Sequence, residues 1–153
     1  MLQNGFNVAS SESVRGIASA LLQFQTEMGV VYKSDNNPFF RSKYASLATI
    51  LSAIKTPLVN AGLTFTQFPT GENGLTTILM HPVSGEWMEA TFTMKPVKAD
   101  PQGQGSAITY QRRYALGAIL GLNIDEDDDG NTASNLEVLP QRTKFPKKDT
   151  NED

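Results

Sequence analysis

The hydrophobic pattern of the chain changes from a helical to a twofold period near residue 63, and this change limits the possible folds most. Alternating apolar and polar residues form three segments, at residues 63–68, 75–81 and 86–94. Short glycine-containing turns separate them. Strands joined in this way predict an antiparallel β-meander. One set of side chains in the third segment is apolar, so one face of the sheet should pack on helices. That set is Met88, Ala90, Phe92 and Met94.

Before the meander, apolar residues recur at helical spacing. A first helix is predicted from an N-cap at Ser10 or Ser11 to a stop at Gly29. Residues 30–44 follow, with apolar and aromatic residues on both sides of a turn-prone Asp-Asn-Asn-Pro stretch. This pattern predicts a hairpin with a basic and aromatic end.

Two further helices are predicted around the meander. One runs from about residue 46 to Gly62, with Pro57 as a kink or an earlier end. The other covers residues 106–120 and follows a loop formed by Gly103-Gln104-Gly105. The predicted class is therefore α+β, an antiparallel meander packed on helices.

Length and composition restrict the classes of protein to consider. The chain has 153 residues and no cysteine, which excludes disulfides, cysteine nucleophiles and thiolate zinc sites. It has no signal-peptide pattern and no apolar run as long as a membrane span, so we expect a soluble cytoplasmic protein without membrane contact. We expect one folded domain at residues 1–130 and a short, disordered charged tail at residues 131–153.

Charge is distributed unevenly along the chain. The formal net charge is −3, but the part up to Ile124 has nine Lys and Arg against seven Asp and Glu. The part from Asp125 onward has four against nine. A mildly basic body is compatible with a groove that binds phosphates.

The third predicted helix carries cations next to aromatic rings. Arg112 and Arg113 lie between Tyr110 and Tyr114. Guanidinium groups bind phosphates, and aromatic rings and guanidinium planes stack on unpaired bases. This combination predicts a site for single-stranded nucleic acid. The alternative is that the tyrosines pack in the core and the arginines form surface ion pairs.

Other basic and aromatic residues extend this prediction. The candidates for phosphate contacts are Arg41, Lys43, Arg112 and Arg113, with Lys95 and Lys98 in second rank. The candidates for base stacking are Tyr44, Tyr110 and Tyr114, although Tyr44 and Tyr114 lie beside apolar residues that would suit a core position.

Several motifs in this order resemble the ERF (essential recombination function) family of single-strand annealing proteins, found mostly in bacteriophages. The motifs are Asn37-Pro38-Phe39-Phe40-Arg41-Ser42-Lys43-Tyr44-Ala45, Gly85-Glu86-Trp87, Gly105-Ser106-Ala107-Ile108-Thr109-Tyr110 with Arg112-Arg113-Tyr114-Ala115-Leu116, and Asp125 to Gly130. The resemblance spans roughly residues 11–130.

The resemblance implies an ATP-independent recombinase that coats single-stranded DNA and anneals complementary strands as a ring or filament of subunits. It implies a curved sheet packed on a helix, similar to the core of eukaryotic annealing recombinases. It implies no catalytic residue and no cofactor, and it suggests a host single-strand-binding protein or a phage exonuclease as further partners. The segment after Gly130 is short and has no obvious second domain.

An acidic run follows the third helix and leaves other functions open. Asp125, Asp127 and Asp129 match the opening of a calcium loop, but Leu136 occupies the position of the bidentate glutamate. These carboxylates are therefore weak metal candidates. Two alternatives to an annealing protein are a metal-dependent DNA phosphodiesterase and an oligomeric adaptor without activity. The chain has no nucleotide-binding P-loop, which argues against nucleotide hydrolysis.

Overall fold

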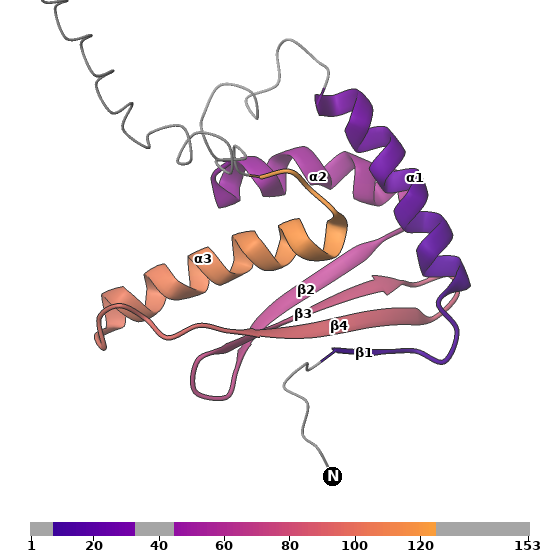
Figure 1. Cartoon of the computed structure of the whole chain (residues 1–153). Helices are drawn as coiled ribbons and strands as arrows, with labels where there is room; N and C mark the ends of the chain where they lie inside the picture. The colour runs from indigo at the N-terminus through magenta and orange to yellow at the C-terminus, as the bar shows by residue number, and fades with distance from the viewer. Residues whose placement is uncertain (1–7, 33–44, 125–153) are drawn as a thin grey trace, which may run out of the picture.

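The computed structural model describes residues 8–32 and 45–124, except for the side chains of residues 29–32. In this part of the chain, three helices lie on one face of a four-stranded antiparallel sheet (Figure 1). The elements are β1 (Val8–Ser10), α1 (Arg15–Tyr32), α2 (Leu47–Ala61), β2 (Thr64–Thr70), β3 (Gly74–His81), β4 (Glu86–Thr93) and α3 (Pro101–Leu120). The predicted α+β class is confirmed.

The sheet contains the predicted meander. Its strand order is β1-β4-β3-β2, so β2, β3 and β4 are neighbours and β1 adds a short strand at one edge. Phe65 of β2 is opposite Leu79 of β3, which is opposite Met88 of β4. Leu79 is fully buried, and the other two pack against the core. The twofold period thus identified the face of the sheet that the helices cover.

One hydrophobic core joins all three helices to this face. Its fully buried side chains are Ile17 and Phe24 of α1, Ile50 and Ile54 of α2, Leu79 of β3, and Leu116 and Leu120 of α3. Burying one such side chain stabilises a fold by about 1.5–3 kcal/mol.

No helix within residues 8–32 and 45–124 is long and apolar enough to cross a lipid bilayer.

The prediction for the first helix is wrong at both ends. Ser10 belongs to β1, and α1 begins only at Arg15. At its other end α1 continues through Gly29 to Tyr32, so residues 30–32 are not an arm of a hairpin. A single glycine costs a helix only about 1 kcal/mol and does not have to end it. The rest of the predicted hairpin, residues 33–44, lies outside the described residues.

The second helix ends as predicted. Gly62 adopts a left-handed conformation with φ of 71°, and its N–H donates to the carbonyl groups of Leu58 and Val59. Pro57 lies inside α2 and does not end it. The N-cap is Ser46, whose hydroxyl accepts a hydrogen bond from the N–H of Thr49.

The third helix begins earlier than predicted, at Pro101, and includes the stretch predicted as a loop. Asp100 caps it, because one carboxylate oxygen accepts a hydrogen bond of 2.6 Å from the N–H of Gly103. The preceding connection folds closely against this first turn. A Cβ on Gly103 would overlap the carbonyl oxygen of Lys98. A glycine is therefore favoured at position 103, although it lies inside a helix, because the β4–α3 connection occupies the space that a side chain would need.

A carboxylate from the sheet closes the N-terminus of α1. One oxygen of Glu86 accepts a hydrogen bond of 2.6 Å from the N–H of Ile17, and the other accepts one of 2.7 Å from the hydroxyl of Ser13. Gly16 leaves room for this contact, because a Cβ there would lie 3.0 Å from the carboxylate. The N–H of Ile17, followed by the hydroxyl of Ser13, lowers the pKa of Glu86 below its ordinary value of 4.5.

Gly103→Ala should destabilise the protein, although alanine is the better helix former. Helix propensity alone favours the change by about 1 kcal/mol. The overlap with the carbonyl oxygen of Lys98 should reverse this and cost about 1–3 kcal/mol in the free energy of unfolding. Urea unfolding followed by circular dichroism measures the difference.

Gly105→Ala is the matched control. Nothing lies within 4 Å of a Cβ at this position. This variant should therefore gain up to about 1 kcal/mol of stability. If both variants are stabilised, Gly103 does not pack against the β4–α3 connection as described.

Glu86→Gln should lower the free energy of unfolding at neutral pH, because it removes the charge from two charge-assisted hydrogen bonds. A pKa that is lowered by folding stabilises the protein above the unfolded value of 4.5, and this stabilisation is lost as the pH falls. The difference between wild type and variant should therefore be largest at neutral pH and shrink below pH 4.5. Thermal unfolding across this range tests it, with Glu89→Gln on the same strand as control. A difference that is independent of pH would contradict the role of the charge.

Candidate nucleic-acid interface

A buried glutamine fixes α3 on the sheet and thereby orients its functional side chains. Gln111 is 1% exposed, and its side-chain amide donates to the carbonyl oxygens of Asn73 at 2.8 Å and Phe92 at 2.9 Å. The first carbonyl lies in the β2–β3 turn and the second in β4. Successive helix residues differ by about 100° in direction, because 3.6 residues make one turn. With Gln111 facing inward, the residues on either side of it must point along the sides of the helix.

Tyr110, Arg113 and Tyr114 form one cluster on α3, which we call the tyrosine–arginine cluster. The two rings are stacked, with centroids 4.4 Å apart and an angle of 30° between their planes. The guanidinium carbon of Arg113 lies 5.4 Å from the ring centroid of Tyr110 and 5.1 Å from that of Tyr114. Cation–π attraction operates at these distances. The spacing of three and four residues along one helix brings these side chains together.

The two tyrosines differ in exposure. Tyr110 is 44% exposed, whereas Tyr114 is half-buried and packs against the hydrophobic core. Tyr114 also lines an apolar groove between α3 and the edge of the sheet, together with Val8, Met88 and Phe92. Tyr110 is therefore the outer ring of the stack and Tyr114 supports it from beneath.

The neighbouring arginine has different contacts. Arg112 is half-buried, and its Nε donates to the side-chain oxygen of Gln67 on β2 over 3.4 Å. The amide of Gln67 donates in return to the backbone carbonyl of Arg112 over 3.1 Å. The two neighbouring arginines thus have different surroundings: Arg112 contacts the sheet, and Arg113 belongs to the tyrosine–arginine cluster.

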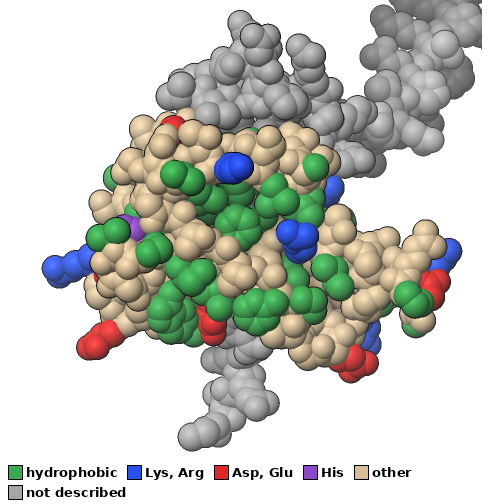
Figure 2. Space-filling model, turned by 180° about the vertical axis from the view of Figure 1, so that it is seen from behind, with side chains coloured by type: hydrophobic (Ala, Val, Ile, Leu, Met, Phe, Trp, Pro, Cys, Tyr) green, Lys and Arg blue, Asp and Glu red, His purple; other side chains and the backbone are tan. Residues whose placement is uncertain are grey.

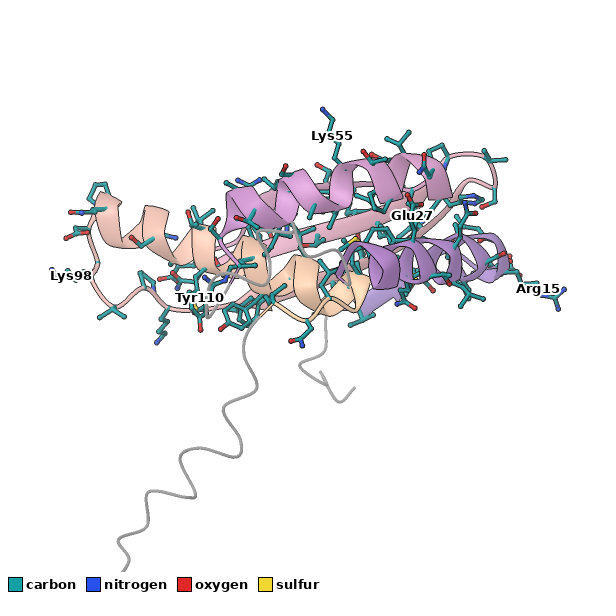
Figure 3. The ribbon with its side chains drawn as sticks, turned by 90° about the horizontal axis from the view of Figure 1, so that it is seen from above. Arg15, Glu27, Lys55, Lys98 and Tyr110 are labelled. Carbon is teal, nitrogen blue, oxygen red and sulfur yellow. The ribbon has the colours of Figure 1, made fainter. Side chains whose placement is uncertain are left out.

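Two lysines lie beside the cluster on the connection between β4 and α3. Lys95 and Lys98 line a groove, which we call the lysine groove, together with Gly103, Ser106 and Tyr110 of α3. Figure 3 shows Lys98 and Tyr110 toward the same end of the molecule, whereas Arg15 lies at the opposite end. The same view shows Lys55 on α2.

A second groove, the arginine groove, separates α3 from the start of α2. Its lining residues are Ser46, Leu47, Gln102, Gly105, Ser106, Thr109, Tyr110 and Arg113. Gln102, Ser106 and Tyr110 line both grooves. Tyr110 therefore lies between the lysines on one side and Arg113 with the N-terminus of α2 on the other.

The back of the molecule differs from this surface. Hydrophobic side chains gather there, and the charged side chains of the described residues mostly stand apart from one another (Figure 2). The outer face of the sheet bears a ladder of hydroxyls, since Thr76 contacts Thr70 at 2.7 Å and Thr91 at 2.8 Å.

The remaining predicted site residues lie outside the described residues: Arg41, Lys43, Tyr44, Asp125, Asp127 and Asp129. Their chain neighbours are nevertheless placed. The N–H of Ala45 donates to the carbonyl oxygen of Ile124 at 2.9 Å. Within residues 8–28 and 45–124, no group of three His, Cys, Asp or Glu side chains is arranged to hold a metal ion.

Sequence reasoning missed the roles of Gln111 and Ser46 at this site. Gln111 follows Ala107 by four residues, and both are buried. Helical spacing could have placed this glutamine on the inner face. The position of Ser46 against α3 depends on tertiary packing.

Gln111→Leu should lower the free energy of unfolding by about 1–3 kcal/mol, because it leaves two carbonyl oxygens without their donor. Urea unfolding measures the loss. Gln102→Leu, at an exposed position on the same helix, should change it by less than about 0.5 kcal/mol. Equal effects of both changes would show that Gln111 does not hold α3.

Comparison with known proteins identifies the family. The family model of the ERF superfamily matches residues 17–153. Comparisons with curated proteins and with solved structures give no match. The matched part includes the meander, α3 and the tyrosine–arginine cluster. The resemblance seen in the motifs is confirmed, and the chain belongs to the ERF superfamily, which is associated with phage DNA recombination and strand annealing.

Proposed function

We propose that the protein binds single-stranded DNA and anneals complementary strands without ATP, as a ring or filament of identical subunits. Membership of the ERF superfamily supports the general role. The observation that carries the assignment of the site is Tyr110, an exposed ring stacked on Tyr114 between two grooves that contain cations.

Annealing makes and breaks no covalent bond. The protein has to reduce the repulsion between two polyanions and keep the bases unpaired and accessible. In this proposal Lys95, Lys98 and Arg113, which line the two grooves, contact phosphates, so the affinity should depend on salt. Tyr110 stacks on a base, an interaction worth about 1–3 kcal/mol that is largely independent of base identity.

The structure supports different roles for the other candidates on α3. Tyr114 is held against the core, so we assign it to support the outer ring rather than to contact DNA. Arg112 contacts Gln67 on β2, which favours a secondary role in DNA binding.

Arg41, Lys43 and Tyr44 remain part of the proposed site. Ala45 follows Tyr44 directly and precedes Ser46, which lines the arginine groove. One residue spans at most about 3.3–3.6 Å of extended chain. Their closeness to Ser46 in the sequence supports their assignment to the proposed site.

Each subunit offers few cations, so we propose that affinity arises by summing contacts over many subunits on one strand. We assign this activity to residues 1–130 and regard residues 131–153 as a tail. We also propose that the protein acts in the cytoplasm of a bacterial host, where a role in DNA recombination would require it. A host single-strand-binding protein or a phage exonuclease are candidate partners.

The decisive experiment is annealing of two complementary labelled oligonucleotides, without nucleotide, at rising salt and with and without magnesium. We expect acceleration that needs no ATP and weakens as salt increases. Loss of DNA that requires magnesium would favour a phosphodiesterase instead. Absence of both binding and acceleration would favour an adaptor.

Variants locate the site in the same assay. Tyr110→Ala should weaken strand binding about fivefold or more, which corresponds to about 1 kcal/mol or more of lost stacking. Arg113→Gln should make the plot of log affinity against log salt concentration less steep, by the amount expected for the loss of about one phosphate contact. Lys55→Gln on α2 is the control, because its exposed charge lies outside both grooves. Equal weakening by all three would contradict a site on α3.

A further inference from the structure

The lysine groove combines its two cations with an apolar lining. Apolar and aromatic side chains reach it from both sides: Met94, Pro96 and Val97 from the β4–α3 connection, and Ala107 and Tyr110 from α3. Lys95 and Lys98 lie on the same connection and are exposed. Such a groove is complementary to a ligand that has a flat ring and negative charges close together. A nucleotide of a DNA strand is a ligand of this kind.

The β4–α3 connection is held at both of its ends. At its start, the N–H of Met94 donates to the carbonyl oxygen of Asn73 at 3.1 Å. At its end, the carbonyl group of Lys98 packs against Gly103 and leaves no room for a Cβ there. Pro96 lies between these points, and its ring fixes the backbone φ angle. A connection held in this way has little freedom to lose when a ligand binds, which favours affinity.

Val97 projects from this fixed connection. It is 102% exposed, although single exposed apolar side chains are common on protein surfaces. The surroundings of this one are distinctive, because it lines the same groove as Tyr110 and is followed directly by Lys98. Val83 on the β3–β4 turn is 89% exposed and lines neither the lysine groove nor the arginine groove. Val97 is therefore placed to contact a ligand that Tyr110 also contacts.

The acidic residue of this lining does not oppose a strand as a free carboxylate would. Asp100 lines the groove, but one of its carboxylate oxygens accepts the 2.6 Å hydrogen bond from the N–H of Gly103 that caps α3. The two lysines outnumber it, so the charge of the groove favours phosphates.

We propose that the lysine groove holds one base of the bound strand between the ring of Tyr110 and the apolar side chains of the β4–α3 connection, with Val97 as the outermost contact. Lys95 and Lys98 then contact the phosphates next to this base. The inference rests on the proposed function, because it assigns a base to one groove of the same site. It adds a second wall to the stacking on Tyr110 and a role for a residue that carries no charge and no ring.

A base held in this groove is withdrawn from its neighbours in the strand. The strand is then unstacked at one position for each subunit, while the remaining bases stay available for pairing. A base inside a hairpin has to leave its stem before it can enter the groove, so binding would also oppose the secondary structure that keeps complementary strands apart.

The test separates contacts with bases from contacts with phosphates. Affinity is measured by fluorescence anisotropy for labelled oligo-dT and for a strand of equal length in which every nucleotide is abasic. The wild-type protein should bind oligo-dT about fivefold or more tightly than the abasic strand. Val97→Ser should weaken binding to oligo-dT about threefold, because it removes apolar contact area, and should leave binding to the abasic strand unchanged. Val97 is exposed, so the thermal unfolding of this variant should match that of the wild type.

Two controls accompany this variant. Val83→Ser removes an equally exposed valine elsewhere and should change the affinity for neither strand. Lys98→Gln should weaken both strands to the same extent, because its contact is with a phosphate. If Val97→Ser weakens both strands equally, or weakens neither, Val97 does not contact a base and the proposal is wrong.

A double variant tests whether the two walls hold the same base. In the Tyr110→Ala background, Val97→Ser should lose most of its effect on oligo-dT, because a base without the ring is no longer pressed against the connection. Additive effects of the two changes would show independent contacts and overturn the shared site.

The same measurements distinguish this inference from the proposed function. A protein that anneals strands but binds oligo-dT and the abasic strand with equal affinity would overturn the base site and leave the annealing function intact. A protein that binds neither strand would contradict the proposed function, and the base site with it.

Discussion

The hydrogen bonds from Gln111 to the carbonyl oxygens of Asn73 and Phe92 set the orientation of α3, and the candidate site depends on this orientation. A buried amide must find partners, because an unpaired one costs about 1–3 kcal/mol. This side chain finds them only when α3 lies over β4 and the β2–β3 turn. Once Gln111 points inward, Tyr110 and Arg113 are directed to the side of the helix that borders the two grooves.

The sheet was predictable because its residues face two different environments. Apolar and polar residues alternate along residues 63–94 because helices cover one face of the sheet. Leu79 and Met88, which lie opposite each other on neighbouring strands, both face this side. β1 carried no comparable signal, since its three residues are all exposed and are held by pairing with β4. The start of α3 had a readable signal in Asp100 and Pro101, but the two glycines nearby favoured a loop.

The site was predictable to the extent that it lies on one helix. The pairing of Tyr110 with Tyr114 and the approach of Arg113 follow from spacings of three and four residues. The separation of Arg112 from Arg113 required knowledge of Gln67, which lies on a strand far away in sequence. In the same way, the sequence predicts Glu86 only as the start of a strand, and the fold shows that it closes the N-terminus of α1.

The small number of DNA contacts proposed for this site suits annealing better than tight binding. A base-pair step in duplex DNA is worth about 1.4 kcal/mol on average, whereas stacking of one base on an aromatic side chain is worth about 1–3 kcal/mol. A protein that stacked every base would therefore oppose pairing. In the described part of the site, Tyr110 is the exposed ring, supported by Tyr114 and flanked by Arg113 and two lysines. Under the proposed function, such a subunit would hold the strand mainly by its phosphates and leave most bases free to pair with a complementary strand.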